Sequence, residues 1–238
     1  MSAKINRHLI KQTRFDSGSL TQLGFVAHQY KTSGRYKVDV YRENELRTSC
    51  YIDVDTDNES LQASIELSGL ELGINTSKKG SCCDSNVKIY KINREGYALF
   101  YVNKGAGKYH VKSYYLESRG ESYLFDSTTL NKGDLFGLTL LRPGRYQLRD
   151  GNSNPLSSLV VEAVKPLEKK YVPPEAINVE LSEIHKMKEI SLLQAQGIIF
   201  NAKSDNRVII DFEDDDEKHQ CGDRPIAARW TKSNAKRG

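Results

Sequence analysis

The amino-acid sequence predicts an all-β protein made of tandem antiparallel β-sandwich modules with flexible, charged termini. Short segments alternate apolar and polar residues, a pattern typical of strands with one buried face. Gly, Pro and Asn separate these segments at short intervals, as they do in antiparallel sandwiches. Tyr, with 13 residues, outnumbers Phe, with 7, and Met, with 2, and this choice of large side chains favours strands.

An internal similarity indicates two copies of one β-rich module. Residues 34–53 match residues 107–126 without a gap, and the matched residues include Gly, Tyr, Val, Ser and Asp. We call this match the Gly34–Gly107 similarity, after its first pair. Its continuation aligns Ala63 with Phe136, Ile65 with Leu138 and Leu67 with Leu140. We therefore expect one β module over residues 21–91 and a second over residues 92–166.

Each module is expected to consist of short strands bounded by turn residues. The strands expected in the first module are residues 35–41, 51–54, 63–67 and 87–90, with a turn at 55–58 and a polar loop at 75–86. Those expected in the second are residues 97–102, 108–115, 122–125, 135–141, 145–149 and 159–164. Residues 135–141 are nearly all apolar, which indicates a central strand.

Residues 167–212 are expected to form a linker and a third β segment. Pro173-Pro174 favours an extended chain in the linker. Residues 183–196 have spacing near that of a helix, yet residues 190–200 could instead be two strands broken at Gly197, and we favour strands. The other candidate strands are residues 177–181, 198–200 and 207–212, the last two flanking a turn at 203–206 as in a hairpin.

Both ends of the chain are rich in charge and are expected to be flexible. Residues 1–20 form a basic arm in which polar residues interrupt every apolar run. Residues 213–238 form a charged tail that begins with five adjacent acidic residues, and such a run repels itself and rarely joins a core. We expect this tail to be disordered unless a partner holds it.

Composition and charge argue against several classes of protein. The net charge of +4 is too small to indicate nucleic-acid binding, although the basic termini could contact phosphate. The N-terminus lacks the apolar run of a secretory signal, and no stretch is long and apolar enough for a membrane span. The four cysteines show no paired spacing, which fits reduced thiols. We therefore expect a cytoplasmic protein, or one within a particle assembled in the cytoplasm.

Two tyrosines that match each other in the Gly34–Gly107 similarity, Tyr36 and Tyr109, are the candidate ligand-binding residues. Exposed rings could stack on a sugar, whereas buried rings would belong to the core with their hydroxyl groups at its rim, which is the commoner arrangement. A metal site could instead use Cys82 and Cys83, or His219 and Cys221 in the tail. An ordinary loop and a solvated tail explain those residues better, so we expect no cofactor.

No common catalytic motif is present in the sequence. It contains no phosphate-binding glycine loop followed by Lys and Ser or Thr, no His-Glu-x-x-His and no nucleophile elbow. Asp53 and Asp126, at equivalent places in the similarity, are better explained as strand-end residues whose carboxylates accept hydrogen bonds from the following turn. We therefore expect a protein that is not an enzyme.

Residues 177–212 resemble the opening half of a cupredoxin-like domain. The resemblance rests on Ile190-Ser191-Leu192 and Gln196-Gly197-Ile198-Ile199-Phe200, while Arg142-Pro143-Gly144-Arg145-Tyr146 resembles a turn of cupredoxin-like and immunoglobulin-like sandwiches. It implies a β-sandwich without copper, because no His lies between His185 and His219 and no Met follows Cys221.

These features together predict a structural or protein-interaction protein that acts through β-sandwich surfaces as a subunit of a larger assembly. Self-assembly and a different protein partner both remain open. Exposed strand edges, the loop around Cys82 and the two tails are the expected contact regions. A carbohydrate-binding module is the first alternative, and a metal-binding protein is the second.

Overall fold

The computed structural model describes residues 7–72, 87–105, 107–151, 154–164 and 171–213, and these residues form three β-sheets with three short helices. The elements as far as the centre of the chain are α1 (Arg7–Ile10), β1 (Arg14–Asp16), β2 (Gly24–His28), β3 (Gly34–Arg42), β4 (Glu45–Asp55), β5 (Gln62–Glu66), α2 (Leu67–Glu71), β6 (Ile89–Asn93), β7 (Tyr97–Tyr101), β8 (Tyr109–Glu117) and β9 (Gly120–Asp126). Then follow β10 (Leu135–Thr139), β11 (Gly144–Asp150), β12 (Pro155–Glu162), β13 (Ile177–Glu180), the 3-10 helix η1 (Leu181–Lys186), β14 (Glu189–Leu193), β15 (Gly197–Asn201) and β16 (Val208–Phe212). The all-β class is confirmed.

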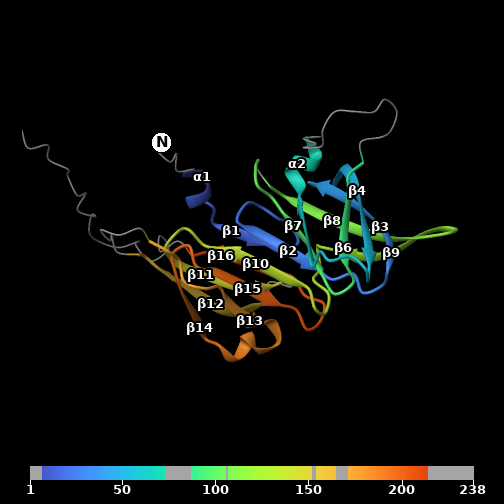
Figure 1. Cartoon of the computed structure of the whole chain (residues 1–238). Coiled ribbons are helices and arrows are strands. Elements are labelled where there is room, and N and C mark those ends of the chain that lie inside the picture. The colour runs from blue at the N-terminus through green and yellow to red at the C-terminus, as the bar shows by residue number, and fades with distance from the viewer. Residues whose placement is uncertain (1–6, 73–86, 106, 152–153, 165–170, 214–238) are drawn as a thin grey trace, which may run out of the picture.

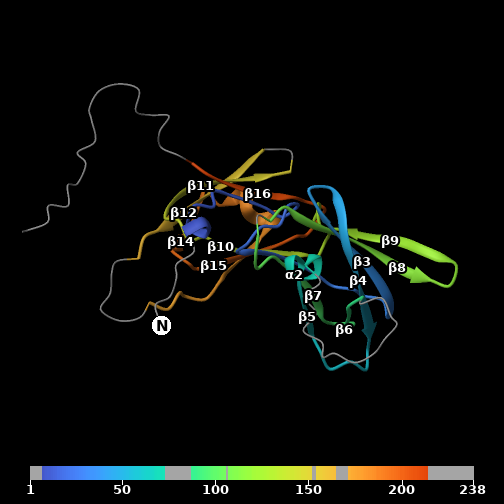
Figure 2. The same cartoon turned by 90° about the horizontal axis from the view of Figure 1, so that it is seen from above.

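The middle sheet has six strands in the order β13-β15-β10-β2-β7-β5. A five-stranded sheet lies toward each end of it (Figures 1 and 2). We call them the β3 sheet, with the order β6-β4-β3-β8-β9, and the β11 sheet, with the order β1-β16-β11-β12-β14. This arrangement differs from the tandem sandwiches that we predicted, because β2 and β10 pair directly and make one continuous sheet of strands from both halves of the chain.

The strands β2 to β8 and β10 to β16 repeat one pattern of pairing. β3 is antiparallel to β4 and β8, as β11 is to β12 and β16. β4 runs parallel to β6, and β12 runs parallel to β14. In the middle sheet β7 lies between β2 and β5, and β15 lies between β10 and β13. A short helix follows β5 in one half and β13 in the other. The described part of the chain thus contains an internal duplication of one arrangement of strands.

This duplication aligns Gly34 with Gly144 and not with Gly107. Gly34-Arg35-Tyr36 begins β3, and Gly144-Arg145-Tyr146 begins β11. Gly34 has a φ of 147° and Gly144 has a φ of 137°. A Cβ atom on either glycine would collide with an aromatic ring, that of Tyr115 at 2.5 Å or that of Phe212 at 2.6 Å. The same close approach therefore requires glycine at both positions.

The Gly34–Gly107 similarity aligns two hairpins of one sheet. β3–β4 and β8–β9 lie side by side in the β3 sheet, because β3 pairs with β8. The continuation of this similarity aligns β5, an edge strand, with β10, which is central.

Strands pair across both predicted module boundaries. β7 pairs with β2 and β5 across the boundary between residues 91 and 92, and β14 pairs with β12 across the boundary between residues 166 and 167. The sheets therefore do not divide at either boundary.

The N-terminal segment is not a free arm from Thr13 onward, because the Thr13 carbonyl oxygen accepts a hydrogen bond from the Phe212 N–H. β1 pairs with β16 and extends the β11 sheet, and Phe15 and Leu20 are buried in the core. The buried Asp16 carboxylate accepts two hydrogen bonds from Arg207, at 2.8 and 2.9 Å. We missed this strand because it is only three residues long and its polar neighbours hide the alternation.

Most strands predicted from alternation are present, with ends that shift by a few residues. The ambiguous region contains the end of η1 followed by β14 and β15, so the two strands that we favoured are present and a short helical turn precedes them. The predicted loop at 75–86 and the tail after 213 lie outside the described residues. Among the described residues, no helix is long and apolar enough to cross a membrane.

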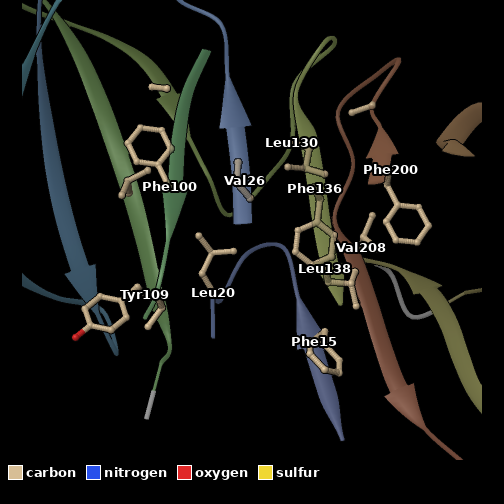
Figure 3. Packing of buried hydrophobic residues seen from close by; sticks show 14 of the residues in the cluster. Phe15, Leu20, Val26, Phe100, Tyr109, Leu130, Phe136, Leu138, Phe200 and Val208 are labelled. Carbon is tan, nitrogen blue, oxygen red and sulfur yellow. The ribbon is translucent and has the colours of Figure 1, made fainter. Parts of the chain in front are cut away.

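The hydrophobic core is one cluster that continues from the first half into the second. Figure 3 shows Phe100 on one side and Phe200 on the other, with Val26 and Phe136 between them. These residues pair in register, Phe100 with Val26, Val26 with Phe136 and Phe136 with Phe200. All of them point to one face of the middle sheet, because directly opposed residues share a face.

Candidate functional site

Tyr36 and Tyr109 are buried, so their rings do not form the exposed stacking surface that the carbohydrate alternative required. Tyr36 is 1% exposed and donates a hydrogen bond to the Thr32 carbonyl oxygen at 2.7 Å. Tyr109 is 2% exposed and donates its hydroxyl hydrogen to Glu71. Burial, helped by the Glu71 carboxylate, raises the pKa of Tyr109 to about 12. Neither ring has a free face for stacking, and both have the core role that we gave as the alternative.

The other predicted site residues, Cys82, Cys83, His219 and Cys221, lie outside the described residues. In the part of the chain that the structure describes, no three His, Cys, Asp or Glu side chains come together in a group that could hold a metal ion. Cys50 is a free thiol buried in the core, and burial raises its pKa to about 12. A thiol held in its neutral form is a poor nucleophile and a poor metal ligand.

Asp53 and Asp126, which we expected to cap strand ends, behave differently from each other. Asp126 accepts a hydrogen bond from the Thr128 N–H at 2.9 Å, as predicted for a strand end. Asp53 instead pairs across the sheet with Arg35, with two contacts of 2.6 and 2.8 Å. This pairing recurs on the β3 sheet, where Lys37 and Lys112 also meet carboxylates. These carboxylates offset the positive charge of the three cations on this sheet.

The face of the middle sheet opposite the core is the candidate functional surface. Its side chains come from strand positions that alternate with the core residues, and five large apolar ones remain partly exposed. They are Phe25 on β2, Leu99 and Tyr101 on β7, Leu135 on β10 and Ile199 on β15. We call this group the outward patch. It draws on both halves of the chain, because β2 and β7 belong to the first and β10 and β15 to the second.

The register of the strands makes the outward patch continuous. Phe25 pairs with Tyr101 on one side and with Gly137 on the other, and Gly137 pairs with Ile199. The Phe25 ring covers Gly137 so closely that a Cβ atom there would lie 2.2 Å from the ring. In the neighbouring row, Ala27 separates Leu99 from Leu135. The glycine and the alanine let the large side chains lie flat across four strands.

Polar side chains border the outward patch on both edge strands of the middle sheet. On β5, Ser64 is opposite Leu99 and Glu66 is opposite Tyr101. On β13, Asn178 is opposite Ile199. The centre of the patch has no charged residue, whereas its borders are hydrophilic. The outward patch therefore has an apolar, partly aromatic centre and a polar rim.

The chain matches no protein-family model, no curated protein and no solved structure. The sequence contains a signal for the outward patch, which we used only to predict a central strand at residues 135–141. Residues 97–102 and 135–141 are apolar at nearly every position instead of at alternate ones. Such runs are typical of strands covered on both faces. The core covers one face of these strands, and the other carries the patch.

Proposed function

We propose that this chain is a non-enzymatic interaction protein that binds another protein subunit through the outward patch. The observation that carries the proposal is the continuous row of partly exposed apolar side chains across four strands, bounded by polar edges. Sheet faces that meet water usually carry polar residues at these positions. A contiguous apolar area on a soluble protein marks an interaction site, because covering it removes apolar surface from water.

The location of the patch supports an assembly rather than a small-ligand site. Strands of both halves form the patch, so it extends across a broad sheet surface. Small molecules usually bind in concave pockets, whereas broad surfaces are typical of contacts with another protein. The partner is either a second copy of this chain or a different subunit. A cytoplasmic location, or one in a particle assembled there, remains a prediction.

A substitution in the centre of the patch tests the proposal. Ile199→Glu places a charge among apolar neighbours, and Asn178→Glu places the same charge opposite it on the polar border. We expect wild-type protein and Asn178→Glu to co-purify from native extract with a stoichiometric partner, or to self-associate at micromolar concentration. Ile199→Glu should lose this association while keeping its thermal unfolding midpoint. Light scattering of the purified protein separates self-association from a different partner.

Two results would contradict the proposal. One is a wild-type protein that is monomeric at micromolar concentration and has no stoichiometric partner in native extract. The other is an Ile199→Glu variant that keeps its complex unchanged.

A further inference from the structure

A small pocket of about 200 Å³ lies where the end of β2 meets the turn that precedes β10. His28, at the end of β2, and Asp134, at the end of that turn, are among the residues that line it. Leu124 on β9 closes another side, so the pocket lies at the base of the β8–β9 hairpin. In Figures 1 and 2 this hairpin extends beyond the other strands of the β3 sheet.

His28 and Asp134 form a buried, oriented pair. The Nδ1 atom of His28 lies 2.7 Å from Oδ1 of Asp134, and the second carboxylate oxygen accepts the Asn131 N–H at 2.6 Å. The imidazole ring stacks on Phe125 at 4.0 Å and meets the edge of Tyr30 at 4.8 Å. These contacts fix the ring plane, with Nδ1 directed at the carboxylate. The Nε2 atom makes no hydrogen bond to any residue that the structure describes, so it is available to a ligand in the pocket.

The rim of the pocket carries unpaired positive charge. Lys31 and Lys132 both line it and are exposed, and neither has a carboxylate partner among the described residues. This differs from Lys37 and Lys112 on the nearby β3 sheet, each of which has one. Among the described residues that line the pocket, Asp134 is the only acidic one, and its carboxylate is already paired with His28. The charge available to a ligand is therefore positive.

The second half of the chain has apolar residues at the positions that correspond to this site. When Gly34 is aligned with Gly144, Leu138 occupies the position of His28, and in the antiparallel register it is opposite Gly24. Leu140 likewise replaces Tyr30, a buried tyrosine. The duplicated fold therefore packs well with leucine at these places. Burying polar groups there costs stability, so their presence in one half alone points to a use other than folding.

We propose that this pocket binds a small oxyanion, a carboxylate or a phosphate group. The Nε2 atom of His28 donates an N–H to an anion oxygen, and Lys31 and Lys132 supply the charge that attracts it. Asp134, Tyr30 and Tyr36 are the other titratable groups at the pocket or against the ring. The volume suits a small anion better than a drug-sized molecule, which needs a larger cavity.

The test is a calorimetric titration of the full-length protein with inorganic phosphate and, separately, with acetate at constant ionic strength. We expect saturable binding of one of the two anions at a single site, and the two arms identify the preferred group. Lys31→Gln with Lys132→Gln should weaken binding about tenfold or more, because each removes a charged contact. His28→Leu, which copies the second half, should abolish it.

Lys188→Gln is the matched control, because Lys188 is an exposed lysine remote from the pocket. It should leave the affinity unchanged. The proposal is overturned if wild-type protein shows no saturable binding of either anion. It is also overturned if the double lysine variant binds as tightly as Lys188→Gln, and this comparison holds whether or not His28→Leu folds.

Discussion

The hydroxyl groups of Tyr36 and Tyr146 make the same hydrogen bond in the two halves of the molecule. Tyr36 donates to the Thr32 carbonyl oxygen at 2.7 Å, and Tyr146 donates to the Arg142 carbonyl oxygen at 2.8 Å. Each acceptor lies four residues before its tyrosine. The ring of Tyr36 packs edge-on against Tyr115, and that of Tyr146 does so against Phe212. In each half, therefore, one tyrosine contacts both the turn before its own strand and an aromatic ring of the neighbouring strand, β8 or β16.

Replacing either tyrosine by phenylalanine should lower the free energy of unfolding by about 1 kcal/mol, because one partly buried hydrogen bond is lost and the ring is kept. The sites belong to different five-stranded sheets, so the double variant should lose the sum of the two effects. Urea unfolding of Tyr36→Phe, Tyr146→Phe and the double variant measures this. A variant with wild-type stability would show that its turn does not depend on the hydroxyl.

Asp16→Ala should destabilise the protein by about 2 kcal/mol, because it leaves the Arg207 guanidinium without its carboxylate and removes the acceptor for the Gly18 N–H. The exposed Glu183–Lys186 pair provides the control. Glu183→Ala should leave the urea midpoint unchanged, since exposed ion pairs contribute little. Equal midpoints for both variants would mean that the Asp16 carboxylate contributes nothing to the stability of the β11 sheet.

Stability should fall as pH rises above about 9, because burial raises the pKa of the Cys50 thiol from 9.0 to about 12. Below pH 9.0, the pKa of the thiol in the unfolded chain, the thiol is protonated in both states and the free energy of unfolding is not reduced. Above that pH the thiol ionises in the unfolded chain but not in the folded protein, so the free energy of unfolding falls progressively until the pH reaches the pKa of the folded state. Burial also raises the pKa of Tyr146 to about 12, which adds a similar loss above pH 10.

Urea unfolding at pH 8 and pH 10.5 measures this dependence. Cys50 alone accounts for about 2 kcal/mol of the loss between these conditions. Cys50→Ala should therefore show a smaller loss than wild-type protein. Identical losses for the two proteins would mean that Cys50 ionises equally in the folded and unfolded states.

Alternation in the sequence was enough to find most strands, because it depends only on which face of a strand is buried. β3 was predicted at residues 35–41 and spans Gly34–Arg42. Strand partners could not be predicted in this way, since the same alternation fits any neighbour. The Gly34–Gly107 similarity misled us because two adjacent hairpins of one sheet share their burial pattern. The shorter repeat of Gly-Arg-Tyr at 34–36 and 144–146 marked the true duplication.

The candidate sites were harder to predict because they depend on contacts between distant segments. Whether Tyr109 points inward or outward depends on the register of its strand, and a single strand does not fix its register. His28 and Asp134 are 106 residues apart, and they meet only because β2 and β10 pair. Nothing near His28 in the sequence indicates that contact.

The first strand of the chain lies against the last described one, since β1 pairs with β16. A ribosome that synthesises this protein therefore exposes Phe15 and its neighbours long before their partners exist. The β11 sheet cannot close until residue 212 has left the exit tunnel, so this sheet forms only after every other described strand has been made. Contacts this distant in sequence make folding slow. The first half can pair its own strands before then, because every strand from β2 to β8 has a partner within it.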